Sequence, residues 1–430
     1  MIAPRIMSTA PSTGASRRPR LFAGWWVVIG AIGVNTLASL LIMQAFGAYF
    51  VHFQEEFGWR KATVAGAFSM GQIITGVISP FQGRLVDRLG ARVMATIGVA
   101  VLSGGVVGLS FVQDLPQLYT AFFFIFLGAA QCGWVTLNTA AAHWFRRRRA
   151  MVLGLVGLGS SFGGLLLPVV AWSLDTFGWR ETAFGSGLVL LVVGVPLARM
   201  VRDRPEKYGL TPDGEALPME AGQAAGEQAD EGDFTLKEAM RTSAFWYIAI
   251  GHGSASLIIA TVSVHLISHL VERVHMSVEM ASVMVALMTA FTICGQLCGG
   301  YLATKAESRV LAAVGMAGQI LGMLALAFAT NVAWVVAFAL VYGVSWGVRG
   351  PVMSSIRAEY FGRAAFGAIL GVSMMLLAIG NVFAPLLAGY MADRTGSYQL
   401  AFVVMGVLGG VGSMFFLLAK RPTRPARRPV

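Results

Sequence analysis

One arginine lies inside an otherwise apolar run. Arg349 stands several residues from either end of the stretch 333–356, and Tyr342, Ser345 and Trp346 precede it by seven, four and three residues. A helix would place all four side chains on one face. A guanidinium beside two aromatic rings and a hydroxyl suits a planar anion such as a carboxylate, which it can hold through two parallel hydrogen bonds. The spacing predicts an anion site; the alternative is an arginine that reaches toward a membrane surface or toward helix-end carbonyls.

Polar side chains also interrupt other apolar runs. Each could bind a ligand or form a hydrogen bond between helices. Among them, His252 is of interest because imidazole titrates near neutral pH, although a simply buried ring is the alternative. The candidate ligand-binding residues outside 333–356 are Asn35, Gln131, Trp134, Asn138, His252 and Ser256, with Ser39, His265 and His269 as further polar positions.

The composition is that of a membrane protein. Of the 430 residues, 56% are hydrophobic and 12% charged, against about 25% charged in soluble domains. Most of the Lys and Arg behind the net charge of +11 fall in the terminal stretches and in alternate loops. That asymmetry follows the positive-inside rule, so it indicates orientation and contact with anionic lipid rather than with nucleic acid.

The three cysteines, Cys132, Cys294 and Cys298, all lie in apolar runs. Cys294 and Cys298 are one helical turn apart, but no His or carboxylate joins them in a metal-like set. We therefore expect small packing residues, with no disulfide framework, no metal site and no cofactor. We also see no nucleophile or paired-carboxylate constellation that would indicate an enzyme.

A membrane span needs about 20 apolar residues, and in lipid the backbone must satisfy its own hydrogen bonds. The sequence therefore predicts an all-α integral membrane protein. The twelve expected helices are 21–50, 62–83, 93–112, 118–142, 150–174, 182–198, 243–270, 280–304, 310–330, 333–356, 364–392 and 398–419.

A polar gap divides these runs into two sets of six. Its Gly, Ala and Glu content suits a flexible linker. At a constant offset, Gly83 aligns with Gly300 and Pro168 with Pro385, and one inserted residue later Asp175 aligns with Asp393. We expect two pseudo-symmetric six-helix bundles. The predicted division is a tail at 1–20, a bundle at 21–201, a linker at 202–242, a bundle at 243–419 and a tail at 420–430.

The stretch from Gly83 to Arg92 joins the second run to the third. Glycine at 83 and 90 permits close backbone approach, and the arginines favour the cytoplasmic side. The sequence G-R-L-V-D-R-L-G-A-R resembles the loop between helices 2 and 3 of the major facilitator superfamily of secondary transporters, with every fixed position filled. The resemblance implies twelve helices in two parallel repeats, with both termini cytoplasmic and a substrate site between the halves.

The resemblance also implies a conformational latch. In that reading Gly83, Asp87, Arg88, Gly90 and Arg92 form the motif, and Asp87 with its neighbouring arginines bridges to the start of the 364–392 helix and favours an outward-facing state. The second copy of the motif has Thr304 where the first has Asp87. This asymmetry places the latch in the first half.

Shorter matches resemble the bacterial monocarboxylate and oxalate–formate branch. They are Gly24-Trp25-Trp26, Phe57-Gly58-Trp59-Arg60 and Tyr360-Phe361-Gly362-Arg363. The charged pair of that branch in helix 8 is absent, because 280–304 carries no charge. The resemblance implies a transporter for a small organic anion, in a bacterial inner membrane and acting as a monomer.

No Asp or Glu lies in the middle of a run, where a proton-coupled transporter often keeps one. Coupling would have to use a histidine, an end carboxylate, the substrate's own proton or a counter-anion. The alternative function is proton-coupled efflux of drugs or other hydrophobic solutes. Against it, the fourth run has no arginine and the fifth has Gly159-Ser160 where efflux antiporters resemble one another in a Gly-Pro pair.

Overall fold

The computed structural model describes residues 22–145, 148–214, 234–302, 305–362 and 366–422. Within these ranges the side chains at 79–80, 83–84, 87, 149–150, 300, 351, 354–355, 358, 366–368, 370–371, 374–375 and 413 are not described. The described part is helical and contains no strand. The predicted all-α class is confirmed.

The first half of the chain forms nine α-helices and two π-helical segments, and short 3₁₀ turns follow. These are α1 (Gly24–Ala38), η1 (Ser39–Gln44), α2 (Phe46–Phe57), α3 (Lys61–Leu89), α4 (Ala91–Leu109), α5 (Leu115–Cys132), α6 (Trp134–Trp144), α7 (Arg149–Phe177), α8 (Trp179–Val189), η2 (Leu190–Gly194), α9 (Val195–Met200), η3 (Pro205–Tyr208) and η4 (Pro212–Gly214).

The second half consists of one short helix and six long ones. They are α10 (Leu236–Met240), α11 (Ser243–Val274), α12 (Val278–Leu302), α13 (Ser308–Ala327), α14 (Val332–Phe361), α15 (Phe366–Thr395) and α16 (Gln399–Leu418).

Eleven helical stretches of the described residues are long and apolar enough to cross a membrane. They coincide with eleven of the twelve predicted runs. The remaining run, 62–83, lies within the 29-residue helix α3, whose last turns carry charged residues. All twelve predicted runs therefore overlap helices, and the chain is a multi-pass membrane protein.

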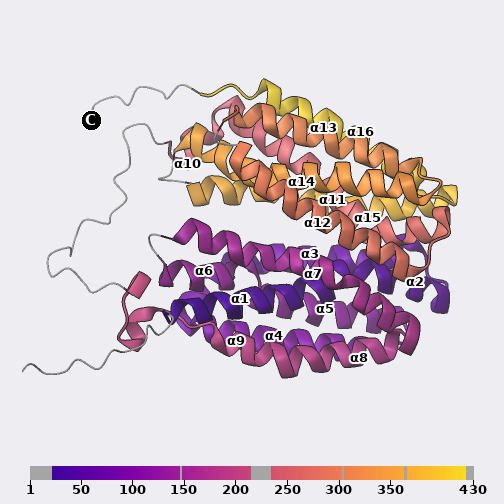
Figure 1. Ribbon diagram of the computed structural model, residues 1–430, viewed down its shortest axis with the longest axis horizontal. Coiled ribbons are helices and arrows are strands. Elements are labelled where there is room, and N and C mark those ends of the chain that lie inside the picture. Colours follow the sequence, from indigo (N-terminus) through magenta and orange to yellow (C-terminus); the bar gives the residue numbers. More distant parts are fainter. Residues whose placement is uncertain (1–21, 146–147, 215–233, 303–304, 363–365, 423–430) are drawn as a thin grey trace, which may run out of the picture.

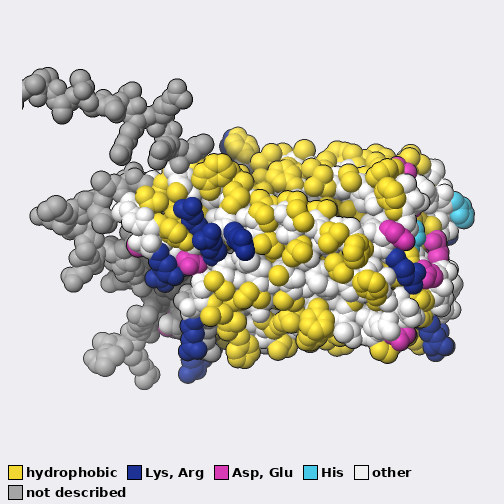
Figure 2. All heavy atoms as spheres, turned by 90° about the horizontal axis from the view of Figure 1, so that it is seen from below, with side chains coloured by type: hydrophobic (Ala, Val, Ile, Leu, Met, Phe, Trp, Pro, Cys, Tyr) yellow, Lys and Arg dark blue, Asp and Glu magenta, His cyan; other side chains and the backbone are white. Residues whose placement is uncertain are grey.

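The long helices run side by side in two groups (Figure 1), with the helices up to α9 on one side and α11–α16 on the other. We call the end that holds α10 the terminal end, and the opposite end, near α2 and α8, the far end. Figure 2 shows hydrophobic side chains over the middle of the molecule and charged groups gathered toward both ends. This distribution is that of a wall facing lipid between two aqueous layers.

Two helices are longer than the apolar runs that predict them. α3 continues to Leu89 and reverses at Gly90, with φ +89°. α14 continues past Ile356 to Phe361 and is followed by Gly362, with φ +78°. An apolar run measures the thickness of the lipid, whereas a helix ends where the backbone meets a residue that leaves the helical region, and glycine does so at little cost.

α14 is held in place by a seam of glycines shared with α12. A Cβ at Gly347 would lie 2.7 Å from the backbone nitrogen of Gln296, and a Cβ at Gly343 would lie 2.5 Å from the carbonyl oxygen of Met288. Such distances bring backbones closer than any larger side chain allows. The seam fixes the rotation of α14 and therefore the directions of its polar side chains.

Both ends of the predicted linker are folded onto the helices. The indole Nε1 of Trp144 donates to the carbonyl oxygens of Arg202 and Asp203 at 3.2 and 3.1 Å. Near the other end, Phe234 packs edge-on against Phe361 and its backbone N–H donates to the carbonyl of that residue. The described ends of the expected linker 202–242 therefore pack against the helices through aromatic anchors, and its residues 215–233 lie outside the described part.

Candidate functional site

A cavity of about 230 Å³ lies between the two groups of helices. Its wall is largely apolar and includes Trp346 of α14. The polar residues on the wall are Ser39 and Gln44 of η1, Ser160 of α7 and Ser263 of α11. The π-helical turn η1 exposes these first-helix groups, as such turns often do at functional sites.

Arg349 lies on α14 three residues after Trp346; it does not line this cavity, and its Cβ lies 3.5 Å from where a Cβ at Gly315 of α13 would be. It is only 4% exposed, and its Nε and Nη1 atoms have no hydrogen-bond acceptor among the described residues. Buried guanidinium groups are normally paired, because an unpaired buried charge is strongly destabilising. Arg349 therefore leaves donors available to an anion.

Of the three residues predicted to share a helix face with Arg349, one lies at the cavity and two pack against α13. Trp346 lines the cavity. Tyr342 is fully buried, its Cβ 2.8 Å from where a Cβ at Gly322 of α13 would lie, and its hydroxyl has no described partner. Ser345 packs against Gly318, also on α13. The helical spacing brings the four residues together, but α13 covers part of that face.

A second buried arginine, Arg357, lies eight residues further along α14 and is 1% exposed. Its Nη1 donates to the carbonyl of Met353 at 2.6 Å, its Nε to Ser373 Oγ at 3.4 Å, and its Nη2 contacts Nδ1 of His252 at 2.8 Å. These partners are neutral. Sequence reasoning missed Arg357 because the predicted run ended at Ile356. The signal was the absence of Gly or Pro between Ile356 and Gly362.

Among the described residues, neither arginine has a carboxylate partner; the described ion pairs involve other residues. Arg349 acts electrostatically on Arg357 and on His252, and all three side chains are buried; we call this set of one imidazole and two guanidinium groups the arginine cluster. Since a carboxylate supplies the acceptors that Nε and Nη1 of Arg349 lack among the described residues, the cluster can hold an organic anion.

The candidates of the first half occupy separate places. Asn35 donates to the carbonyl of Val156 at 2.8 Å and so joins α1 to α7. Asn138 donates to the carbonyl of Trp134 at 2.8 Å within α6, while the Trp134 side chain is 62% exposed. The Oε1 of Gln131 and the Oδ1 of Asn138 are buried without a described partner. None of these four lines the cavity.

The remaining polar residues of α11 bond mainly to backbone. Ser256 donates to the carbonyl of Gly253 at 2.6 Å and lies against Gly380 of α15. The Nε2 atoms of His265 and His269 lie 2.9 Å from the carbonyls of Pro385 and Leu326. These residues join α11 to its neighbours rather than to a cavity.

The predicted latch falls partly on residues that are not described. The side chain of Asp87 and the residues 363–365 lie outside the described part, so the proposed bridge to the next bundle is not visible. Arg88 is exposed. The described part of the motif contacts Asp203, a residue outside the motif. The Oδ1 of Asp203 accepts a hydrogen bond from the backbone N–H of Arg92 at 3.1 Å. A Cβ at Gly90 would lie 2.5 Å from the same oxygen.

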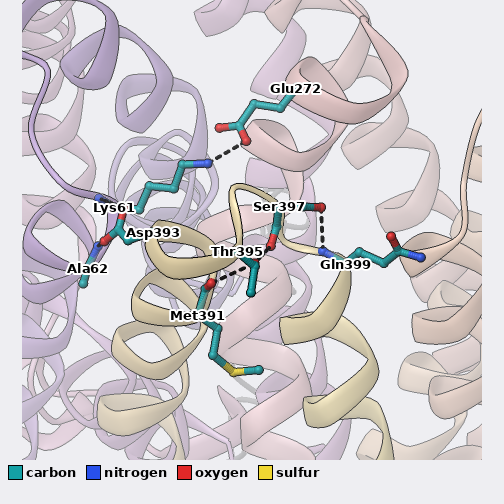
Figure 3. A network of polar contacts seen from close by, with 8 residues as sticks. All are labelled: Lys61, Ala62, Glu272, Met391, Asp393, Thr395, Ser397 and Gln399. Carbon is teal, nitrogen blue, oxygen red and sulfur yellow. Dashed lines mark hydrogen bonds and ion pairs between the residues drawn. The ribbon is translucent and has the colours of Figure 1, made fainter.

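At the far end a polar network crosses between the two groups of helices (Figure 3). The carboxylate of Asp393 accepts hydrogen bonds from the backbone N–H groups of Lys61 and Ala62 at 2.9 and 3.0 Å. The Nζ of Lys61 lies 2.6 Å from Oε2 of Glu272 and 4.3 Å from the ring centre of Tyr398. This network holds the far end closed in this conformation.

Metal chemistry finds no support in the described part of the chain, where no three His, Cys, Asp or Glu side chains gather as ligands. The described cysteines are free.

A sequence model of the Major Facilitator Superfamily matches residues 32–356 and, in a second match, 248–430. Monocarboxylate transporter 11 of Mus musculus is 26% identical over 423 residues, covering 92% of this chain and 87% of that protein. Monocarboxylate transporter 12 of Xenopus laevis is 25% identical over 420 residues, covering 94% and 90%.

Two solved structures share the fold. A bacterial homologue of the human lysosomal transporter Spinster, in an inward-facing and occupied conformation, superposes with a TM-score of 0.73 at 15% identity, covering 94% of this chain and 99% of that one. A mutant of the nucleoside transporter NupG gives a TM-score of 0.71 at 12% identity, covering 91% and 99%. At these identities the likeness concerns architecture alone.

Proposed function

Because the chain belongs to the major facilitator superfamily of transporters, we propose that it moves a small organic anion, a mono- or dicarboxylate, across the membrane by alternating access. In this mechanism the two groups of helices rock about a central site. The similarity to monocarboxylate transporters over most of the chain supports this class of substrate. Transport rather than enzymatic chemistry is the activity of this family.

The observation that supports the proposal is that Nε and Nη1 of the buried Arg349 have no acceptor among the described residues. A membrane-embedded cation is costly, about 2.5–3.5 kcal/mol on insertion scales, and by default marks a functional site. Here the cation is buried, two of its nitrogens lack described acceptors, and its neighbour Arg357 is also positive. A carboxylate would satisfy the free donors and offset the repulsion between the two arginines.

The remaining parts of the proposal concern orientation and partners. The terminal end faces the cytoplasm of a bacterial cell, with the chain in the inner membrane, because most of its Lys and Arg belong to that end by the predicted topology. The far-end network would then close the outer side. We further propose that the protein works as a monomer in contact with anionic lipid, and that a proton or a counter-anion accompanies the substrate.

Thermal unfolding of the purified protein with a panel of ligands tests the proposal. A ligand at a hundred times its Kd stabilises by about 2.7 kcal/mol. We expect lactate, pyruvate, oxalate or succinate to raise the melting temperature of the wild type. The Arg349→Gln variant should bind the same ligand about ten- to a hundredfold more weakly, because a charge-assisted hydrogen bond is lost.

Arg309→Gln is the matched control, since Arg309 lies on α13 at the surface and pairs with Glu307 at 2.7 Å. It should respond to carboxylates as the wild type does. Stabilisation of the wild type and Arg349→Gln alike by tetraphenylphosphonium, with no response to carboxylates, would overturn the proposal and favour efflux of hydrophobic cations.

A further inference from the structure

His252 is positioned to act as more than a passive member of the arginine cluster. It is 8% exposed, and its Nδ1 lies 2.8 Å from Nη2 of Arg357. A guanidinium nitrogen can only donate a hydrogen bond, so Nδ1 must accept it through a lone pair. The ring is therefore neutral in this conformation, with its proton on Nε2.

The surroundings of the ring are positive and otherwise apolar. The charged groups that act on it are Arg349 and Arg357, both from α14. On either side of His252, Gly253 packs against Leu376 of α15 and Gly251 against Phe416 of α16. In the described part of these elements, no carboxylate is placed to favour a positive ring. A proton on Nδ1 would add a third positive charge and break the bond to Arg357.

Two features therefore oppose protonation of Nδ1, namely the positive surroundings and the hydrogen bond from Arg357. An anion bound in the cluster removes both. Its negative charge offsets the arginines, and its oxygens attract the donors of Arg357 away from the imidazole. Nδ1 then has a free lone pair in a site whose net charge has fallen by one. Anion and proton binding become mutually favourable, and by linkage each strengthens the other equally.

We propose that His252 takes up one proton when a carboxylate binds to the arginine cluster, so that proton and anion occupy the transporter together. This inference rests on the proposed function. The proton comes from water and binds Nδ1, the proton on Nε2 stays, and Nη2 of Arg357 turns to the carboxylate. With a monocarboxylate, the loaded site carries the same net charge as the empty site, which makes both forms equally suited to reorientation.

Calorimetric titration of lactate and of oxalate into the purified protein measures this uptake directly. Run at pH 7 in phosphate and in Tris, which differ in ionisation enthalpy, the titrations give the number of protons taken up for each anion bound. We expect a value near one for wild type. His252→Asn keeps an acceptor near the Nδ1 position for Arg357 but cannot be protonated, so carboxylate should bind with uptake near zero.

His52→Gln serves as the matched control, because that imidazole lies at the far end beside Glu55 and Asp175, away from the cluster. It should retain uptake near one. Carboxylate binding without proton uptake in wild type, or with undiminished uptake in His252→Asn, overturns the inference and leaves the proposed function standing. If neither probe binds wild type, the anion function itself fails and the inference falls with it.

A second readout needs no variant. Between the pH at which the ring of the empty site loses its proton and the higher pH at which the ring of the loaded site does, the affinity of wild type for carboxylate should fall about tenfold for each unit of rising pH. Below that range the affinity is highest and level. A constant affinity between pH 5 and pH 9, with carboxylate bound throughout, contradicts the assignment even if His252→Asn fails to fold.

Discussion

Asp393, at the end of α15, caps the first turn of α3 in the opposite group of helices through the backbone N–H of Lys61 at 2.9 Å. Ala62 donates to the other oxygen of the same carboxylate, and Gly389 lets the two backbones meet, since a Cβ there would lie 2.9 Å from Ala62. A carboxylate at a helix N-terminus is stabilising because it satisfies free donors and the helix dipole. The closed far end depends on this cap.

Replacing Asp393 by Asn should open the far end. Losing about 1–2 kcal/mol of a two-state preference changes the ratio of closed to open molecules about five- to thirtyfold. Spin labels at Glu55 and Glu279, both exposed at the far end on opposite groups, would report a longer mean distance in a cysteine-free background. Asp175→Asn is the control, because this repeat-related residue contacts His52 of its own group at 3.8 Å. An unchanged distance distribution in Asp393→Asn would refute the gate.

The α12–α14 seam predicts opposite outcomes for two glycines of one helix. Gly347→Ala forces a methyl group against the backbone of Gln296, and we expect a loss of about 1–3 kcal/mol from overpacking. Gly350→Ala meets no atom within 4 Å and should be neutral or stabilising by about 0.5–1 kcal/mol. Thermal unfolding in the same detergent compares them. Equal melting temperatures would show that the seam does not set the position of α14.

Asp203 should stabilise the reversal between α3 and α4. Its carboxylate accepts from the N–H of Arg92 at 3.1 Å and pairs with Lys207 at 3.1 Å. Asp203→Ala removes a helix cap worth about 1 kcal/mol, so the melting temperature should fall by about 2–4 °C. Glu206→Ala, an exposed carboxylate of the same segment, should have little effect. A matching fall in Glu206→Ala would assign the effect to charge alone.

Asp87→Asn tests the latch that the loop motif implies. We expect carboxylate uptake into proteoliposomes to fall at least about tenfold, the effect of about 1.4 kcal/mol on a conformational equilibrium. Insertion and elution as a monodisperse protein should be unchanged, because a single acidic charge contributes little to membrane topology. Arg349→Gln supplies the comparison for lost binding. Full uptake by Asp87→Asn would remove the residue from the mechanism.

Much of the fold follows from the sequence, since each predicted run overlaps a helix. The apolar lengths fix the helices because lipid leaves no other partner for backbone N–H and C=O groups. The apolar lengths predict the ends of the helices less well, because α3 and α14 continue beyond their apolar runs as far as Gly90 and Gly362. Conformational preference at single glycines, rather than hydrophobicity, decides where those helices stop.

The candidate site was accessible to sequence reasoning only in part. A charge inside an apolar run identifies Arg349 whatever surrounds it, because burial of a cation is costly in any membrane fold. Helical spacing also groups it with Trp346. It cannot show that α13 covers Tyr342 and Ser345, since a helix face acquires its neighbours only through packing.

The sequence by itself determined an all-helical membrane protein with one intramembrane arginine, because these follow from local composition and periodicity, and the resemblance of the stretch 83–92 implied the transporter family. Only the tertiary structure joined His252 to Arg357, 105 positions away, and Asp393 to Lys61, 332 positions away. Such pairs depend on how closely whole helices approach and at what rotation. Those quantities are set by glycine seams and interlocking side chains, which act between segments and leave no periodic signal in either one.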